Sequence, residues 1–177
     1  MKIRTKPLCV TAIFTALICV LSPISIPLPF GVPLTLQTLI IALTAFLLGT
    51  KRAVTAVICY ILIGIAGLPV FSGFSAGASV LFSPTGGFIF AFPAFSLILS
   101  YVFYVNKTSS KILLIDLALV LLYLAGIIQF TAVTGNSVIT AVSAFLLYFI
   151  KDVAVVFAAY FLCVRIRPGV MKFMQSK

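Results

Sequence analysis

The chain has 177 residues, of which 63% are hydrophobic and only 8% are charged. Soluble domains carry about 25% charged residues, so this composition excludes an ordinary water-soluble protein and indicates that most of the surface faces lipid. The chain contains no His and no Glu and only two Asp, which removes the imidazole base, the Ser-His-Asp triad and the His-ligated metal on which many enzymes depend.

Basic residues divide the chain into three long intervals, 7–50, 53–106 and 112–164, of which the first two carry no charge at all. One membrane crossing takes about 20 apolar residues, so each interval is long enough to cross and return. Each interval also has Pro- or Gly-containing turn signals near its middle. We therefore predict six transmembrane helices, at Pro7–Leu21, Leu34–Thr50, Ala53–Ala66, Phe88–Val105, Ile112–Val133 and Val138–Val164.

In this arrangement every basic residue except Lys151 lies on one side of the membrane, which predicts that both termini are cytoplasmic. The basic residues that give the net charge of +10 are distributed by this spacing and do not form one nucleic-acid-binding patch. We expect residues 1–177 to form a single all-α domain in the cytoplasmic membrane of a bacterium. The basic, apolar N-terminus imitates a signal peptide, but it lacks a small-residue cleavage site, so an uncleaved first helix is expected.

Three features precede the last helix in chain order. Ala12 and Ala16 lie four residues apart on the first helix, a spacing that lets another helix approach closely in lipid. Thr35 and Gln37 follow a Pro-rich outer turn and are interpreted either as the mouth of a cavity or as helix capping and lateral hydrogen bonding. The segment Gly67–Gly87 is predicted to fold back as a lid or re-entrant element against protein.

Lys151 and Asp152 interrupt the last apolar helix. An ionisable side chain within a span costs about 2.5–3.5 kcal/mol or more, and such residues usually mark a site or relay. The alternative is a local salt bridge, which the sequence disfavours because adjacent helical residues point about 100° apart while natural partners lie three or four residues apart. Tyr148 shares the face of Asp152 and is interpreted as part of the same polar pocket or as an ordinary interior tyrosine.

Three sequence blocks resemble the signature blocks of the BioY family, which are biotin-binding S components of energy-coupling-factor (ECF) uptake systems. The blocks are Val32–Thr38 (VPLTLQT), Gly67–Phe71 (GLPVF) and Ser83–Phe88 (SPTGGF). The resemblance implies a six-helix S-component bundle that binds biotin from outside. It also implies that Ala12 and Ala16 dock onto a transmembrane coupling subunit and that two ATPase subunits drive transport. The chain has no phosphate-binding loop, so we expect no cofactor in this chain and any ATP to be used by partner subunits.

The resemblance also suggests a binding site. Asp152 matches the Asp that reaches the ligand in the last helix of the family, whereas the family's Lys three residues later is Val155 here, and Lys151 is offered as its replacement. A carboxylate accepts well from the ureido N–H groups of biotin, and a cation suits the valerate carboxylate. The remaining expected contacts are Gln37 or Asn136 for the ureido carbonyl, Phe71, Phe74 and Tyr148 for the apolar parts, and Thr35 at the mouth.

Three other functions are weighed against biotin uptake. An S component or solo transporter for a different, biotin-related vitamin would keep the architecture and change the pocket. A membrane enzyme would need a positioned acid–base pair, and only Lys151 and Asp152 are available. A scaffold without a ligand would bury Lys151 and Asp152 in helix contacts rather than expose them to a cavity.

Overall fold

The computed structural model describes residues 5–26 and 34–175, and its architecture is all-helical apart from one short ribbon. The helices and strands are α1 (Thr5–Leu21), β1 (Ser25–Ile26), β2 (Leu34–Thr35), α2 (Gln37–Leu48), α3 (Thr50–Ile65), α4 (Gly86–Tyr101), α5 (Thr108–Thr134) and α6 (Val138–Gln175). Three 3-10 turns complete them: η1 (Ser72–Phe74), η2 (Ala78–Phe82) and η3 (Val102–Tyr104). The expected all-α class is therefore confirmed.

Three helices in the described part of the chain are long and apolar enough to cross a membrane: Gly86–Tyr104, Thr108–Thr134 and Val138–Gln175. Thr5–Leu21 and Gln37–Leu48 are apolar but shorter. Much of the outer surface of α5 and α6 is apolar and exposed, as at Leu113, Ile139 and Phe161. Exposed apolar area of this extent is typical of a surface that contacts lipid. The count of six transmembrane spans stays a prediction.

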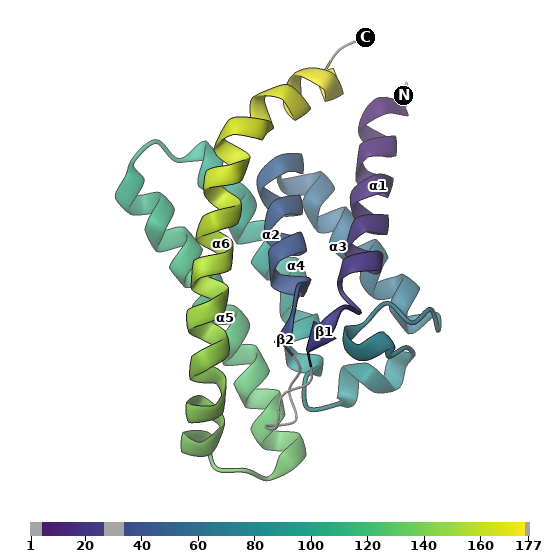
Figure 1. Ribbon diagram of the computed structural model, residues 1–177, viewed down its shortest axis with the longest axis vertical. Coiled ribbons are helices and arrows are strands. Elements are labelled where there is room, and N and C mark those ends of the chain that lie inside the picture. The colour runs from purple at the N-terminus through teal and green to yellow at the C-terminus, as the bar shows by residue number, and fades with distance from the viewer. Residues whose placement is uncertain (1–4, 27–33, 176–177) are drawn as a thin grey trace.

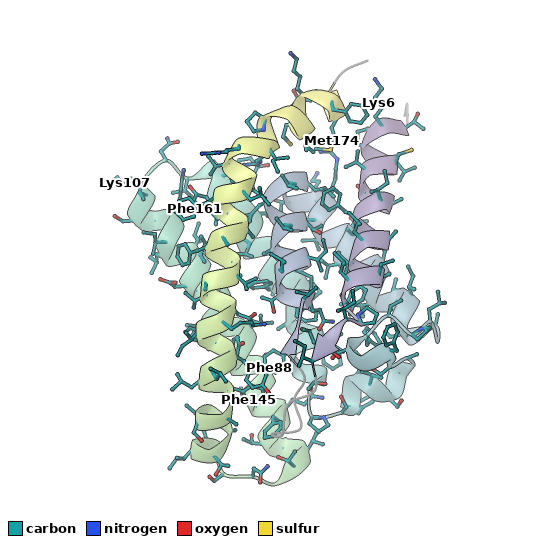
Figure 2. All side chains as sticks on the ribbon, viewed as in Figure 1. Lys6, Phe88, Lys107, Phe145, Phe161 and Met174 are labelled. Atoms are coloured by element: carbon teal, nitrogen blue, oxygen red, sulfur yellow. The ribbon has the colours of Figure 1, made fainter. Side chains whose placement is uncertain are left out.

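The start of α1 and the end of α6 lie at the same end of the molecule, and the turn between α5 and α6 lies at the opposite end (Figure 1). Lys6 and Lys107 both lie toward the first of these ends, which we call the basic end, whereas Phe88 and Phe145 lie together in the other half (Figure 2). Two cations that are distant in sequence thus share one end, as the spacing of the charges predicts.

The predicted helix boundaries needed two notable corrections. The second helix begins at Gln37 rather than Leu34, because Leu34 and Thr35 pair as β2 with β1 in an antiparallel ribbon. The last helix continues to Gln175 rather than ending at Val164, so the first charges past the apolar run do not end it. The guanidinium carbon of Arg167 lies 4.2 Å from the ring centroid of Phe103, a cation–π contact that packs this extension against η3.

Helix α4 packs along α5, and α2 packs along α6. Glycines permit the first of these contacts. The backbone of Gly87 lies against the carbonyl of Ala125, and Gly126 lies against the ring of Phe88, so a Cβ at either glycine would collide with its neighbour. Close packing at small residues is the usual way in which helices associate in lipid, and here it brings the start of α4 onto the middle of α5.

Within residues 67–87, Gly86 and Gly87 begin α4, and the part before them forms two 3-10 turns folded against the bundle. The Gly77 N–H donates to the Gly64 carbonyl (2.8 Å), and the Gly73 N–H donates to the Pro23 carbonyl (3.2 Å). The Phe71 ring is fully buried against Gly64, where any side chain would clash with it. The expected packing of this segment against protein is thus observed.

Candidate functional site

A cavity of about 290 Å³ lies between the folded segment 67–87, α2, the start of α4, α5 and the middle of α6. This volume is near the lower end of the range for small-molecule pockets. Two of its lining residues, Phe88 and Phe145, lie in the half of the molecule away from the basic end (Figure 2). Six of the eight residues that the sequence nominated for the ligand line this cavity: Thr35, Gln37, Phe71, Tyr148, Lys151 and Asp152.

The structure does not bring the other two nominated residues to the cavity. The Phe74 side chain is 68% exposed in η1, where Phe71 rather than Phe74 turns inward. Asn136 is exposed in the turn between α5 and α6. Its backbone N–H donates to the hydroxyl of Thr134 (3.4 Å), a hydrogen bond that stabilises the turn.

Asp152 is the most buried charged group of the cavity, with 5% of its surface exposed. Its Oδ2 accepts hydrogen bonds from the Tyr123 hydroxyl (2.7 Å) and the Thr38 hydroxyl (3.2 Å). Bonds from α5 and α2 therefore fix the orientation of a carboxylate carried by α6. Such bonds stabilise the charged form of a buried carboxylate.

Lys151 and Asp152 form an ion pair, with the Lys151 Nζ 2.6 Å from the Asp152 Oδ1. The expectation that neighbours on a helix are poor mutual partners was therefore wrong. That rule describes the directions of the Cβ atoms, but the flexible four-carbon stem of a lysine bends back to its neighbour. The same Nζ donates to the Thr35 carbonyl on β2 (3.3 Å), which ties α6 to the ribbon.

The two oxygens of Asp152 differ in their remaining capacity. The Lys151 ammonium approaches Oδ1 closely enough for charge attraction, yet the contact lacks hydrogen-bond geometry, and Oδ1 accepts no hydrogen bond from any described residue. A buried acceptor without a partner is costly. Oδ1 of Asp152 is therefore the natural acceptor for a donor on a molecule that enters the cavity.

Aromatic side chains from α4, α5 and α6 form the apolar wall of the cavity. Phe88 lies 5.4 Å from both Tyr123 and Phe145, measured between ring centroids, and Phe145 lies 6.0 Å from Tyr148. Edge-on and tilted contacts of this kind are favourable. They also hold the rings in fixed positions, so the wall is formed before any ligand arrives.

Gln37 and Phe71 are both held from behind by Tyr60, a fully buried residue of α3. The Gln37 Nε2 donates to the Tyr60 hydroxyl, and the Phe71 ring packs edge-on against Tyr60 at 5.6 Å. One of the two N–H groups of Gln37 is thus already used. Gln37 itself lines the cavity.

Gln129 on α5 fixes the folded segment over the cavity. Its Nε2 donates to the carbonyls of Leu81 (2.6 Å) and Ser83 (2.9 Å). A side chain at Gly86 would collide with the Leu81 carbonyl and the Gln129 amide, so a glycine is required at this close approach. One side chain therefore joins η2 to α5.

Sequence reasoning missed the contributions of Thr38, Tyr123 and Phe145. Thr38 is the neighbour of Gln37, and Phe145 shares the helical face of Tyr148 and Asp152, so their positions carried a signal. Tyr123 carried none, because it is one tyrosine in an apolar helix and its partner lies 29 residues away.

Ala12 and Ala16 are exposed on α1, while Thr11, Thr15 and Ile18 form its buried face. The Thr15 hydroxyl contacts the Ala56 carbonyl of α3 (3.4 Å), which fixes the rotation of α1 on the bundle. The pair of small residues consequently faces outward, away from the cavity.

Comparison with known families adds the deciding observation. The model of the BioY family matches residues 1–172 of the chain. The chain belongs to the BioY family. Curated BioY relatives include the biotin transporter BioY2 of Lactococcus lactis subsp. cremoris, 44% identical over 90 residues, and the biotin transporter BioY of Thermotoga maritima, 54% identical over 80 residues.

Those two alignments cover 51% and 45% of this chain, and the chain spans only about half the length of each relative (49% and 47%). A longer alignment joins it to the probable biotin transporter BioY of Pyrococcus horikoshii, at 34% identity over 70% of this chain and 73% of the relative. Among solved structures, the S-component for biotin from an ECF-type ABC transporter superposes with a TM-score of 0.84. At 22% identity over 93% of this chain and 92% of that one, this likeness establishes the S-component fold.

Proposed function

We propose that this BioY chain is a high-affinity biotin-binding S component that takes up biotin across the cytoplasmic membrane of a bacterium, together with an ATP-driven energy-coupling module. The cavity around Asp152 carries the proposal. It combines an apolar aromatic wall with one oriented carboxylate whose Oδ1 lacks a hydrogen-bond partner among the described residues. Mostly apolar pockets with a few placed polar groups suit tight binding of small molecules. The names of the curated relatives supply the ligand.

In this proposal the fused ring system of biotin lies against Phe71, Phe88 and Phe145, with a ureido N–H donating to the Asp152 Oδ1. Tyr123 and Thr38 act as positioning residues because they hold Oδ2 and thereby aim Oδ1. The chemistry matches, since a charge-assisted N–H···O bond in a dry site is stronger than a neutral one. Gln37 lies beside the same site and suits the ureido carbonyl.

The proposed topology has six crossings with both termini in the cytoplasm, as one domain over residues 1–177. The clustering of Lys6 and Lys107 at one end supports it, since basic residues mark the cytoplasmic face (Figure 2). The cavity lies in the other half of the molecule and so opens to the outside in this orientation. A helix shorter than a full span, such as α2, then crosses together with the ribbon strand that directly precedes it.

The proposed partners are a transmembrane coupling subunit, docked at Ala12 and Ala16, and two ATPase subunits. The exposure of both alanines on a helix whose opposite face is packed supports this docking. ATP is then hydrolysed in the partner subunits, and this chain supplies the substrate site.

The test is equilibrium binding of labelled biotin to the purified chain in detergent or nanodiscs. Saturable binding at or below micromolar biotin is expected, and its absence at micromolar biotin contradicts the ligand assignment. Uptake by a biotin-auxotrophic cell that expresses the chain with and without an energy-coupling module then distinguishes assisted from solo transport. If desthiobiotin or another ureido compound binds while biotin does not, a biotin-related vitamin replaces biotin as the substrate.

A further inference from the structure

The cavity carries no net charge. Lys151 and Asp152 are the only charged residues that line it in the described part of the chain, and they are paired with each other. Residues 27–33, which the structure does not describe, have the sequence PLPFGVP and include no ionisable side chain. The resemblance to the family led us to expect that Lys151 neutralises the ligand carboxylate, but Lys151 already has a counterion in Asp152.

Lys151 is also costly to recruit away from that counterion. Its Nζ is held by the Asp152 Oδ1 at 2.6 Å and by the Thr35 carbonyl at 3.3 Å. Asp152 is 5% exposed, so departure of the ammonium leaves a buried carboxylate without its partner charge. Removing one partner of a buried ion pair is strongly destabilising. An anionic group on a ligand therefore gains little affinity from contact with Lys151, because that contact is offset by the loss of the ion pair at Asp152.

Two buried polar atoms of residues that line the cavity make no hydrogen bond with any described residue, and both suit uncharged ligand atoms. The Asp152 Oδ1 is an acceptor that suits an N–H group, and the buried Ser72 hydroxyl, which also has no hydrogen-bond partner among the described residues, is a donor that suits a carbonyl oxygen. Segment 67–87 contributes three other polar side chains to the lining of the cavity, and all three are hydroxyls: Ser75, Ser83 and Thr85. A carbonyl oxygen is present in a carboxylic acid, an ester and an amide alike.

We propose that this cavity recognises the N–H-bearing ureido head and the carbonyl of the tail, and not the negative charge of the ligand. The site then accepts neutral esters and amides of biotin as a further ligand class, with the tail end left in water at the mouth. This inference rests on the proposed biotin function and sharpens it. It differs from a site in which an unpaired lysine binds the ligand carboxylate and so selects for it.

The test is competition against labelled biotin on the wild-type chain, which needs no variant and so carries no folding risk. The competitors are biotin, biotin methyl ester, biotinamide, and lipoate, which keeps the carboxylate tail but has no ureido group. We expect the ester and the amide to bind within about tenfold of biotin, and lipoate to bind at least a hundredfold more weakly. Loss of a desolvated ion pair would instead weaken both neutral ligands by about a hundredfold.

The possible outcomes distinguish a failure of this inference from a failure of the proposed function. Ester and amide affinities within tenfold of biotin, with weak lipoate, support the inference. The inference is overturned if the ester and the amide bind more than tenfold more weakly than biotin, or if lipoate binds within tenfold of biotin. In either case saturable binding of biotin still upholds the proposed function. No saturable binding of biotin overturns the proposed function and this inference with it.

Discussion

At the scale of single residues, Asp152 shows how three helices build one acceptor. The carboxylate belongs to α6, its Oδ2 is held by Tyr123 of α5 and Thr38 of α2, and its Oδ1 lies 2.6 Å from the Lys151 ammonium. The hydroxyl donors lower the cost of burying the charge. They also restrict its rotation, so that a ligand does not lose affinity in ordering the carboxylate.

The variant Tyr123→Phe tests this positioning role. The ring and its contacts with Phe88 remain, but Oδ2 of Asp152 loses its shorter hydrogen bond. A hydrogen bond to a charged group contributes about 1.5–3 kcal/mol, and because Thr38 still donates to Oδ2 we expect a loss of about fivefold to tenfold in biotin affinity. Isothermal titration of the purified protein measures it. The control is Tyr160→Phe, which alters a tyrosine outside the cavity; equal losses in both variants contradict the role.

Sequence alone predicted those site residues whose type is unusual in an apolar span. Lys151 and Asp152 are conspicuous there because charge is costly in lipid, and Tyr148 follows from the helical repeat. Tyr123 could not be predicted, because its role depends on how α5 is rotated against α6, whereas Thr38 was missed although it is the neighbour of Gln37. Phe74 was expected at the ligand together with Phe71 and Tyr148, and only Phe74 was wrong, because aromatic composition does not specify which residues at a 3-10 turn face inward.

At the scale of elements, segment 67–87 and its anchor to α5 decide how closed the cavity is. Gln129 donates to two carbonyls of η2 and the turn that follows it, and Phe71 packs between α3 and the cavity. The turn signals in the sequence predicted that this segment is irregular. Its two 3-10 turns depend on tertiary contacts such as that of Phe71 with Gly64 and therefore were not predictable locally.

The variant Gln129→Leu tests the anchor. Two part-buried carbonyls lose their donor, which we expect to destabilise the local structure by up to about 1–3 kcal/mol for each unsatisfied group. Hydrogen–deuterium exchange of residues 78–86 is expected to rise severalfold, and biotin is expected to dissociate faster. Thr131→Val, two residues nearer to the α5–α6 turn, is the control, because its hydroxyl bonds only within α5. Unchanged exchange in Gln129→Leu contradicts the anchoring role.

At the scale of the whole molecule, Lys6 and Lys107 lie toward one end, and the cavity lies in the other half (Figure 2). This separation suits a chain that takes its ligand on one side and contacts partners along its flank. Charge spacing predicted the polarity of the molecule because the positive-inside rule acts on the whole chain. It did not predict the length of α6, whose extension depends on the stacking of Arg167 on Phe103.

The double variant Ala12→Leu with Ala16→Leu tests whether the exposed face of α1 docks onto a coupling subunit. Both side chains are exposed, so the bundle is expected to fold and to bind biotin with unchanged affinity. Bulk at a small-residue interface blocks close helix approach, and uptake in cells that carry the coupling module is expected to fall at least tenfold. The matched control is Ala154→Leu with Ala158→Leu, an exposed pair at the same spacing on α6. Equal uptake losses in both double variants contradict docking at α1.

The most direct test of the account is the biotin affinity of Asp152→Asn beside that of Asp116→Asn, the same change at the other carboxylate of the chain. We expect a loss of about tenfold to a hundredfold for Asp152→Asn, because a charge-assisted bond to the ureido group becomes a neutral one. We expect a change of less than about twofold for Asp116→Asn, which does not line the cavity. Wild-type affinity in Asp152→Asn, measured on monodisperse protein, would contradict a biotin site at this carboxylate.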